Sequence, residues 1–368
     1  MSRLSRRKFL KASAAGGVAS AGIAAPAIAQ SMPEIKWRCT SSFPKSLDTL
    51  YGSLEFFCKR VAEMTDNRFQ IQPFAAGEIV PGLQAQDAVT NGTVEACQTA
   101  SYYYWGKDPT FTFGTSLPFG FNPRGQHAWW YHGGGAEVMN EYFKKYNFYA
   151  IMFGNTGGQM GGFFRSELKN LDALKGLKMR IGGFAGIIVQ KLGLVPQQLA
   201  AGDIYPALEK GTLDATEWVG PYDDEKLGFH KVAKYYYYPG WWEGSATGHL
   251  FINDKKWEEL PKNYKSIVLA AAGEGHMWQH SKYDAVNPAA LKRLLSAGIQ
   301  LRQFPEDVLD ASFKAANEIY ADLAAKNPDF KKVYDHYKPQ RSDWFTWYQI
   351  TDYTYDTYMI IQNRKKLL

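Results

Sequence analysis

Two stretches of the chain repeat one pattern. Residues 88–98 read A-V-T-N-G-T-V-E-A-C-Q, and residues 207–217 read A-L-E-K-G-T-L-D-A-T-E. Each stretch predicts the end of a helix, a glycine turn and the start of a strand, because glycine suits the left-handed backbone that often closes a helix. The identical pairs are Ala88 and Ala207, Gly92 and Gly211, Thr93 and Thr212, and Ala96 and Ala215. Chance similarity between two ordinary units is the alternative, but we interpret the repeat as two lobes of related topology.

Strand and helix patterns alternate around the first copy. Residues 34–40 and 68–73 read as strands, 82–91 as a short helix and 93–99 as a further strand. Between the first two strands, apolar residues at helical spacing form one face. That face consists of Leu47, Leu50, Leu54, Phe57, Val61 and Met64. The alternation predicts an α/β fold with largely parallel sheet.

The segments that follow the two repeats, 99–105 and 217–222, are rich in aromatic residues with polar tips. Ligands of open α/β sheets bind beyond the carboxyl ends of the strands. Such side chains suit the lining of a site for a small polar ligand. We therefore expect these segments to form the walls of one cleft between the lobes, with Tyr103 and Tyr104 as substrate contacts.

An arginine lies in a predicted strand of the second lobe. Residues 176–183 read G-L-K-M-R-I-G-G, which places Arg180 near the end of an apolar strand. A buried guanidinium needs an anionic partner, because an unpaired buried charge is costly. The partner is either a ligand or an internal acidic residue, and the sequence leaves both open.

The rest of the chain predicts a returning strand and long helices. Residues 246–253 read as a strand of the first lobe, and 262–297 and 311–326 read as helices. The tail, 342–368, reads as a helical segment with many aromatic residues. Because so aromatic a surface is seldom left in water, we expect the tail to pack across a lobe or against a second chain.

Charge and cysteine content exclude several classes of function. The formal net charge is +6, but residues 1–29 carry five basic residues and no acidic one. Removing these five leaves 37 basic against 36 acidic residues. This balance excludes a polyanion-binding surface, so we expect no nucleic-acid partner. Cys39, Cys58 and Cys97 form no C-x-x-C pair, which argues against a metal cluster and leaves one disulfide or buried thiols open.

The first residues have the order of an export signal. Residues 5–11 read S-R-R-K-F-L-K and precede a short apolar stretch and the small-residue site Ala27-Ile28-Ala29. The paired arginines resemble a twin-arginine signal, which predicts a periplasmic location. A membrane anchor or an amphipathic helix is the alternative, but the apolar stretch is shorter than a spanning helix.

Several segments together resemble the TRAP transporter solute receptors, the DctP-type periplasmic substrate-binding proteins. They are the leader, K-G-L-K-M-R-I-G-G, G-T-L-D-A-T-E-W and L-F-I-N-D-K-K-W-E-E-L-P. The segments N-T-G-G-Q-M-G-G, D-A-T-E-W-V-G-P and P-G-W-W-E-G are similar to the branch that binds 2-oxo acids or lactate with a metal ion. The resemblance covers the chain from Glu34 to its end. It implies a two-lobed periplasmic-binding-protein-like fold, with a ligand cleft between lobes and long C-terminal helices.

The resemblance also implies roles for particular residues. Arg180 falls on the arginine that clamps the substrate carboxylate, for which a planar guanidinium is well shaped. The metal ligands fall on the Gln159 amide, the Trp218 carbonyl and the Glu243 carboxylate. These are hard oxygen ligands that suit Na⁺ or Ca²⁺. Na⁺ is favoured here, because Arg180, Glu243, a monovalent cation and a monocarboxylate together sum to zero charge.

Glu217 departs from the amide that many dicarboxylate and sialic-acid receptors carry near this position. A carboxylate there would repel a second substrate carboxylate, which favours a monocarboxylate such as pyruvate. Glu217 would bind the metal, contact a substrate hydroxyl or pair with Arg180. The implied partners are a small organic acid, the membrane permease subunits and a second copy of the chain.

The expected division of the chain follows from the same resemblance. It comprises the signal peptide at 1–29, lobe one at 30–154, lobe two at 155–249, a return to lobe one at 250–305 and C-terminal helices at 306–368.

Other functions remain as alternatives. A receptor for lactate or for another organic or sugar acid would use the same cleft. An exported glycoside hydrolase would use Glu217 and Glu243 as paired carboxylates. No G-x-S-x-G or H-E-x-x-H motif is present, so we expect a binding protein and no enzyme.

Overall fold

The computed structural model describes residues 32–366. The chain divides into residues 1–35 and residues 36–368. Of the first unit, 32–35 are described, and Ile35 opens the first strand. The export signal predicted at 1–29 lies outside the described residues. None of the described helices is both long and apolar enough to cross a membrane.

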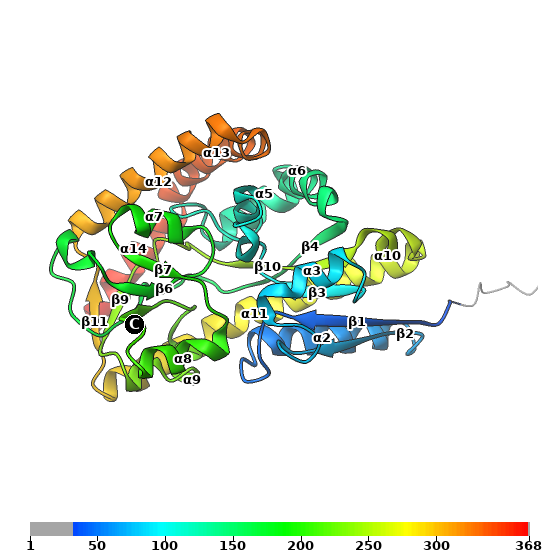
Figure 1. The fold of residues 1–368 in the computed structure, drawn as a ribbon, viewed down its shortest axis with the longest axis horizontal. Coiled ribbons are helices and arrows are strands. Elements are labelled where there is room, and N and C mark those ends of the chain that lie inside the picture. Colours follow the sequence, from blue (N-terminus) through cyan, green and yellow to red (C-terminus); the bar gives the residue numbers. More distant parts are fainter. Residues whose placement is uncertain (1–31, 367–368) are drawn as a thin grey trace, which may run out of the picture. The chain divides into compact units, whose positions relative to one another are not determined.

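The first sheet has the strand order β2-β1-β3-β10-β4 (Figure 1). Its strands are β1 (Ile35–Ser41), β2 (Phe69–Phe74), β3 (Ala96–Thr99), β4 (Phe148–Asn155) and β10 (Thr247–Asn253). β1 and β3 are parallel, whereas β10 runs antiparallel to both β3 and β4. The helix α2 (Leu50–Met64) packs against β2 and α11 (Lys262–Ser296), and α11 packs against β4. We call this sheet with its helices the first lobe.

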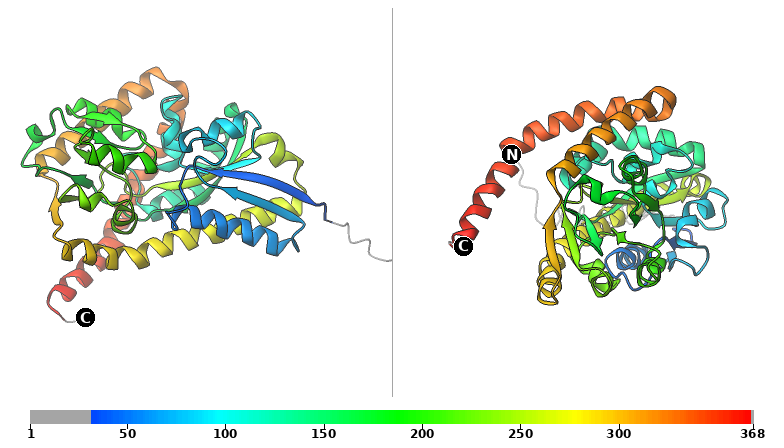
Figure 2. Two further views of the ribbon diagram at one scale, coloured as in Figure 1. Left: turned by 60° about the horizontal axis from the view of Figure 1, so that its bottom comes forward. Right: turned by 60° about the vertical axis from the view of Figure 1, so that its left-hand side comes forward.

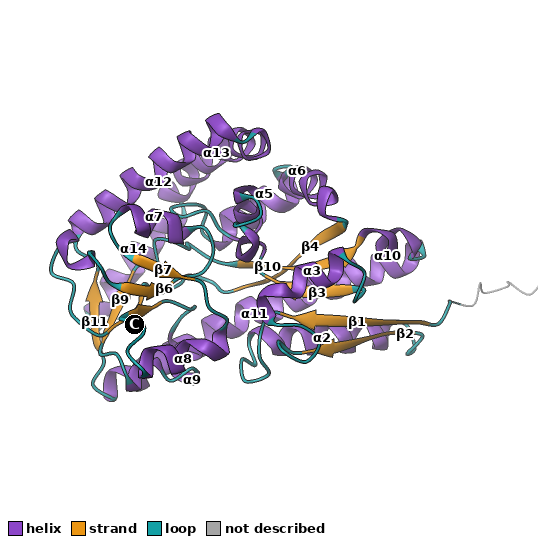
Figure 3. Cartoon of the chain, in the orientation of Figure 1, coloured by secondary structure: helices purple, strands orange, loops and turns teal. Residues whose placement is uncertain are grey.

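The second sheet has the order β11-β9-β5-β8-β6-β7 (Figure 3). Its strands are β5 (Gly162–Phe164), β6 (Lys178–Arg180), β7 (Val195–Gln197), β8 (Ala215–Thr216), β9 (Tyr235–Tyr238) and β11 (Gln300–Gln303). β6 is parallel to β7 and β8, and β5 is antiparallel to β8 and β9. With α7 (Ala185–Lys191) and α8 (Ala201–Glu209) it forms the second lobe.

One strand differs from the expected division of the chain. Residues 250–305 were assigned to a return to the first lobe, but β11 pairs in parallel with β9 of the second sheet. The reason is the length of α11, which starts beside β4 in the first lobe and delivers the chain to the edge of the second sheet. The remaining boundaries of that division stay predictions.

The internal repeat forms two matching units. In the first, α3 (Ala85–Thr90) leads through Gly92, with φ of +70°, into β3. In the second, α8 leads through Gly211, with φ of +73°, into β8. Equivalent amides close both turns, since Gly92 N donates to Val89 O and Gly211 N to Leu208 O, each at 3.0 Å. Each repeat therefore delivers a strand that lies parallel to an earlier strand of its own sheet.

Three helices end the chain: α12 (Glu306–Lys326), α13 (Pro328–Ile350) and α14 (Asp352–Arg364). α12 packs against α7 of the second lobe, and α13 packs against α5 (Pro123–His132) and α6 (Gly135–Phe143), the second of which contacts β4 (Figure 2). The expected packing of this region across the lobes is therefore observed for α12 and α13. α14 buries none of its residues in the single chain. The exposed apolar side chains of the tail are Phe345, Trp347, Ile350, Tyr353, Tyr355, Tyr358, Ile360 and Ile361.

The remaining helices are short. They are α4 (Thr112–Thr115), α9 (Pro221–Lys226) and α10 (Asp254–Glu259), with 3-10 turns that include η2 (Ser101–Tyr104). Cys39, Cys58 and Cys97 are free and buried, so of the two alternatives left open by the sequence the structure contains buried thiols.

Candidate functional site

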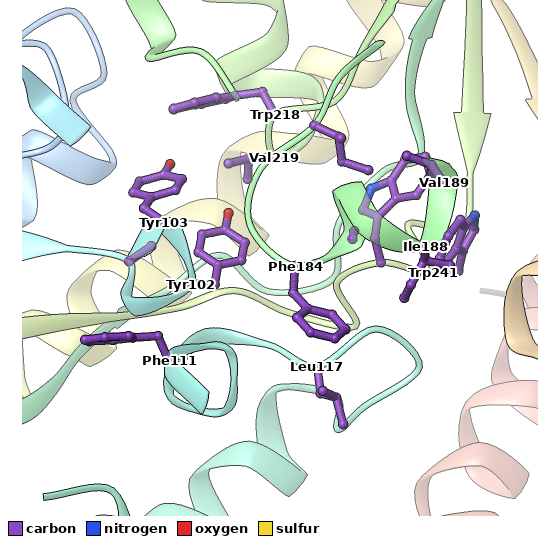
Figure 4. Packing of buried hydrophobic residues seen from close by; sticks show 14 of the residues in the cluster. Tyr102, Tyr103, Phe111, Leu117, Phe184, Ile188, Val189, Trp218, Val219 and Trp241 are labelled. Carbon is purple, nitrogen blue, oxygen red and sulfur yellow. The ribbon is translucent and has the colours of Figure 1, made fainter. Parts of the chain in front are cut away.

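A cavity lies where the two repeats end. Tyr102 and Tyr103 line it from η2, directly after β3, and Trp218 and Val219 line it from the segment after β8. The hydroxyl groups of both tyrosines are directed toward the segment that carries Trp218 and Val219 (Figure 4). The expected cleft between the lobes is therefore present. Gln159, from the turn after β4, completes this end of the cavity.

Arg180 ends β6 and is 1% exposed. Its Nη1 donates to the carbonyl oxygen of Glu217 at 2.8 Å and also contacts Glu217 Oε1. Its Nε donates to Leu199 O at 3.2 Å, and the guanidinium lies 4.7 Å from the ring centre of Trp218. Nη2 makes no hydrogen bond to another described residue. One edge of the guanidinium is thus held by the protein. Arg180 itself does not line the cavity, and its contact with a substrate carboxylate stays a prediction.

Glu217 is the internal acidic partner of Arg180. Its side chain is fully buried, and Oε1 also accepts from Gly182 N at 2.6 Å. Burial raises the pKa of Glu217, and the charge of Arg180 acts in the opposite direction. Because an arginine stays protonated, direct contact with it favours the ionised carboxylate. Of the three roles that the sequence left open for Glu217, pairing with Arg180 is the one observed.

Gln159 presents an oxygen without a partner. Its Nε2 donates to Thr156 Oγ1 at 3.0 Å, which fixes the amide, and its Oε1 is buried with no hydrogen bond among the described residues. The backbone of Gln159 is held from the other side, where Gly240 N donates to its carbonyl at 3.1 Å. A Cβ at residue 240 would lie 2.8 Å from that carbonyl oxygen, so only glycine permits this approach.

Glu243 presents a second such oxygen. It follows Gly240 in a turn, with Glu243 N donating to Gly240 O at 3.1 Å. Its carboxylate is 2% exposed, and Oε2 has no hydrogen-bond partner among the described residues. Burial, and then the charge of Glu217, raise the pKa of Glu243 well above its usual value, while the Tyr102 hydroxyl and the Gln159 amide act to lower it.

Glu217 Oε2 is a third buried oxygen without a partner among the described residues. Such oxygens are costly unless something binds them. An amide oxygen and a carboxylate oxygen are ligands for Na⁺ or Ca²⁺ and suit zinc poorly. The donor set therefore fits a hard cation. The described residues contain no group of three or more His, Cys, Asp and Glu residues arranged for a metal.

The backbone carbonyl groups of both neighbours of Trp218 accept hydrogen bonds. The Glu217 carbonyl accepts from Arg180, and the Val219 carbonyl accepts from Met160 N at 3.0 Å. These contacts fix the backbone at Trp218 beside Gln159 and Arg180. The metal role of its carbonyl stays a prediction.

The two tyrosines predicted as substrate contacts differ in position. Tyr103 lines the cavity, whereas Tyr104 does not. The Tyr104 hydroxyl accepts from Gln86 N at 3.0 Å and bonds Thr99 Oγ1 at 2.9 Å, so Tyr104 belongs to the core of the first lobe. The sequence prediction missed Tyr102, which lines the cavity and acts on Glu243. Strand alternation ends at Thr99, and the 3-10 turn that follows decides which tyrosine faces the cavity.

Comparison with known proteins identifies the family. Residues 40–327 match the family described as "Bacterial extracellular solute-binding protein, family 7". The chain belongs to this family.

Family 7 contains the solute-binding proteins of TRAP transporters, which are transport proteins. The chain is 46% identical, over 89% of its length and 90% of the relative's, to the monocarboxylate 2-oxoacid-binding periplasmic protein of Nostoc sp. (strain PCC 7120). Among solved structures, the TRAP solute-binding protein of Bordetella bronchiseptica is 49% identical, with a TM-score of 0.90 over 91% of this chain and 99% of the other. That structure is described as a mixed-occupancy dimer with copurified calcium and picolinate in one active site.

Two further family 7 structures are described with the same small acid and different cations. The protein of Pseudoalteromonas atlantica contains sodium and pyruvate, and is 36% identical with a TM-score of 0.85 over 88% of this chain and 98% of the other. The protein of Colwellia psychrerythraea contains calcium and pyruvate, and is 34% identical with the same TM-score and coverage.

Proposed function

We propose that this chain is the periplasmic solute-binding subunit of a TRAP transporter and captures a monocarboxylate 2-oxo acid together with a cation. The observation that carries the proposal is the pair of buried oxygens without partners, Gln159 Oε1 and Glu243 Oε2. Gln159 lines the cavity, and the Gln159 amide and the Arg180 charge both act on the Glu243 carboxylate. Gln159, Glu243 and the Trp218 carbonyl would hold the cation. Arg180 would bind the substrate carboxylate through Nη2.

The chain's own charges favour a divalent ion over the Na⁺ that the sequence suggested. Glu217 neutralises Arg180, so Glu243 and a bound monocarboxylate together carry two negative charges in a buried site. A divalent cation makes the sum zero, whereas Na⁺ leaves one negative charge. Burial favours neutrality. We therefore infer that Ca²⁺ is preferred.

Binding would join the two lobes, because Tyr102 and Tyr103 line the cavity from the first lobe and Trp218 lines it from the second. The loaded protein would then present the acid to the membrane permease. Export by a twin-arginine signal and a dimer formed through the exposed aromatic tail complete the proposal. Both agree with the periplasmic relatives and with the dimer of the Bordetella protein.

The other candidates fit the geometry less well. A glycoside hydrolase needs two carboxylates free to act on a sugar, but Glu217 Oε1 is held by Arg180 and Gly182. A lactate receptor would use the same residues, and differs only in the group that replaces the keto oxygen.

Calorimetric titration of the exported, metal-stripped protein tests the proposal. We expect pyruvate to bind with Ca²⁺ present and to bind weakly or not at all after chelation, and succinate not to bind. Binding of succinate in place of pyruvate, or equal binding with and without a cation, would reject this assignment.

A further inference from the structure

The backbone carbonyl of Trp218 is a further oxygen without a partner at this site. Trp218 is 5% exposed, and its carbonyl oxygen accepts no hydrogen bond from another described residue. Trp218 lines the cavity together with Val219 and Gln159. In the proposed function this carbonyl is a cation ligand, so the group that fixes its direction also decides whether it can bind the ion.

The direction of this carbonyl is set through the amide that follows it. The carbonyl of Trp218 and the N–H of Val219 belong to one peptide group, and this peptide bond is trans. In a planar trans peptide the C=O and the N–H point in opposite directions. A group that binds the Val219 N–H therefore determines which way the Trp218 carbonyl points.

Asp224 binds that N–H. Val219 N donates to Asp224 Oδ1 at 3.3 Å, and Asp224 is 1% exposed. Asp224 lies in α9, where its own N–H donates to Gly220 O at 3.0 Å and closes the first turn. Its second carboxylate oxygen, Oδ2, accepts from the buried Tyr236 hydroxyl of β9 at 2.6 Å. The carboxylate is thus held between the cavity segment and the second sheet.

The same segment is also held on its other side. Val219 O accepts from Met160 N at 3.0 Å, and the neighbouring Gln159 O accepts from Gly240 N at 3.1 Å. These bonds connect the segment to the two turns that carry the Gln159 and Glu243 side chains. The peptide group before Val219 can therefore rotate only by breaking buried hydrogen bonds, which is costly.

We propose that Asp224 is a positioning residue of the cation site, because by accepting from Val219 N it directs the Trp218 carbonyl toward the cation. Asp224 itself touches neither the ion nor the acid. Loss of a group that orients a metal ligand typically costs about 10–100-fold in metal affinity. This inference rests on the proposed function, since Asp224 has this role only if a cation binds here.

Two substitutions separate positioning from charge. Asp224→Asn keeps an oxygen for Val219 N and a nitrogen that can donate to the Tyr236 oxygen, but carries no charge. Asp224→Leu keeps the approximate shape and leaves Val219 N without an acceptor. Calorimetric titration of the metal-stripped protein with CaCl₂, with pyruvate present, measures the cation affinity. We expect Asp224→Leu to weaken Ca²⁺ binding by about tenfold or more, and Asp224→Asn to stay within about threefold of the wild type.

The neighbouring Asp223 offers a matched control. It is also fully buried in α9 and accepts from Thr49 Oγ1 at 2.8 Å and from the Tyr283 hydroxyl at 2.6 Å, but it makes no hydrogen bond to the segment that carries Trp218. Asp223→Leu should lower the melting temperature as Asp224→Leu does, because each change leaves buried donors without an acceptor.

The coordination of the ion gives a readout that loss of stability does not change. Tb³⁺ takes the oxygen ligands of Ca²⁺, and its emission is excited through nearby tryptophan side chains such as Trp218. The emission lifetimes in H₂O and D₂O give the number of water molecules on the bound ion. In Asp224→Leu a water should replace the misdirected carbonyl, so that number should rise by about one. Asp224→Asn and Asp223→Leu should keep the wild-type number.

The outcomes distinguish the two proposals. If the wild type binds neither Ca²⁺ nor Tb³⁺ with pyruvate present, the proposed function is wrong. If it binds them but Asp224→Leu keeps the wild-type affinity and water number, Asp224 does not position the carbonyl.

Equal losses of affinity in Asp224→Asn and Asp224→Leu would also overturn the positioning role, because they would show that Asp224 acts through its charge. An equal rise in water number in Asp223→Leu would overturn it as well. If Asp224→Leu does not fold, Asp224→Ser replaces it with the same expectations, because the shorter serine side chain does not reach Val219 N.

Discussion

Arg180 and Glu217 form an ion pair in which the two side chains are 1% and 0% exposed. β6 and β8 run in parallel with Arg180 opposite Thr216, so the strand register places Glu217 at the end of the arginine side chain. Glu217 thus neutralises the buried positive charge of Arg180. With Arg180 neutralised, the charge of the Glu243 carboxylate is the one that the cation and the substrate must balance.

Replacing Glu217 by glutamine tests this relationship. Glu217→Gln keeps the size and an oxygen for Gly182 N, but removes the negative charge. The neutral sum is then reached with Na⁺, so the ratio of affinities for Ca²⁺ and Na⁺ should fall by about tenfold or more. Calorimetry of pyruvate with each cation measures that ratio. A ratio equal to that of the wild type would show that Glu217 does not set the cation preference.

Replacing Arg180 by lysine removes the planar fork. The ammonium group of lysine is compact and lacks the planar fork of donors, so it cannot bond Glu217 and a substrate carboxylate at once. Arg180→Lys should therefore weaken pyruvate binding by about 2–5 kcal/mol. Calorimetry measures the loss. Arg165, which donates from Nε to Leu213 O at 3.2 Å in the same lobe, offers a matched control in Arg165→Lys. Similar losses in both variants would place Arg180 outside the binding site.

The cation ligands are tested by removing one oxygen at a time. Gln159→Leu and Glu243→Gln should each reduce Ca²⁺ affinity by about tenfold or more, because the buried oxygen is lost or its charge is removed. Without a cation, both changes should raise the melting temperature, since Gln159→Leu removes an unpartnered buried oxygen and Glu243→Gln removes a buried negative charge. Calorimetric Ca²⁺ titrations and thermal melts with EDTA give the two readouts. Unchanged Ca²⁺ affinity in either variant would remove that residue from the ligand set.

Two neighbouring buried aspartates give a pH dependence of stability. Burial raises the pKa of Asp224 to about 8 and that of Asp223 to about 6. Asp224 faces the Tyr236 hydroxyl, which donates at 2.6 Å, the Val219 amide, and the carboxylates of Asp223 and Glu217. The folded state therefore binds more protons than the unfolded state between the ordinary aspartate pKa and about 8, so this contribution to stability falls as pH rises.

Asp224→Asn should remove this loss. The unfolding free energy of the variant minus that of the wild type should increase from pH 5 to pH 8, by at most about 1.4 kcal/mol per pH unit. Urea unfolding at several pH values measures it. Asp203→Asn, on the exposed face of α8, is the control and should give a constant difference. A constant difference for Asp224→Asn as well would contradict the prediction.

Asp48 joins the segment after β1 to α9 and α11. It follows β1 in the first lobe, pairs with Lys226 of α9 and accepts from the Tyr222 hydroxyl at 3.2 Å and Lys282 Nζ at 2.8 Å. We expect Asp48→Asn to weaken acid binding by less than about tenfold, because these pairs are partly exposed. The effect should shrink in high salt, as calorimetry at two ionic strengths would show. An acid affinity equal to that of the wild type at both salt concentrations would exclude a role for Asp48 in acid binding.

The sequence predicted the features that depend on local chemistry. The glycine turns at Gly92 and Gly211 were predictable, because a left-handed residue at a helix end has a recognisable pattern. The position of Arg180 in a strand was predictable for a similar reason. Its partner was not, because the choice between a ligand and Glu217 depends on how β6 and β8 pair.

Other features depend on packing that no local pattern encodes. Three consecutive tyrosines follow β3, and only the 3-10 turn turns Tyr102 and Tyr103 toward the cavity and Tyr104 into the core. β11 reaches the second sheet because α11 carries the chain there. The Gly240 contact with Gln159 joins segments far apart in the sequence, so no local pattern reveals what approaches this glycine.

The C-terminal hairpin has a consequence for how domain motion can be followed. α12 packs mainly against α7, and α13 mainly against α5 and α6. The chain passes between them at Asn327, whose side chain accepts from Asp329 N at 2.9 Å. Any relative rotation of the halves must bend this junction or slide one helix along its support. The angle between α12 and α13 should therefore change when the lobes move relative to each other. A pair of spin labels on the exposed faces of these helices would measure that change and leave the proposed binding residues unaltered.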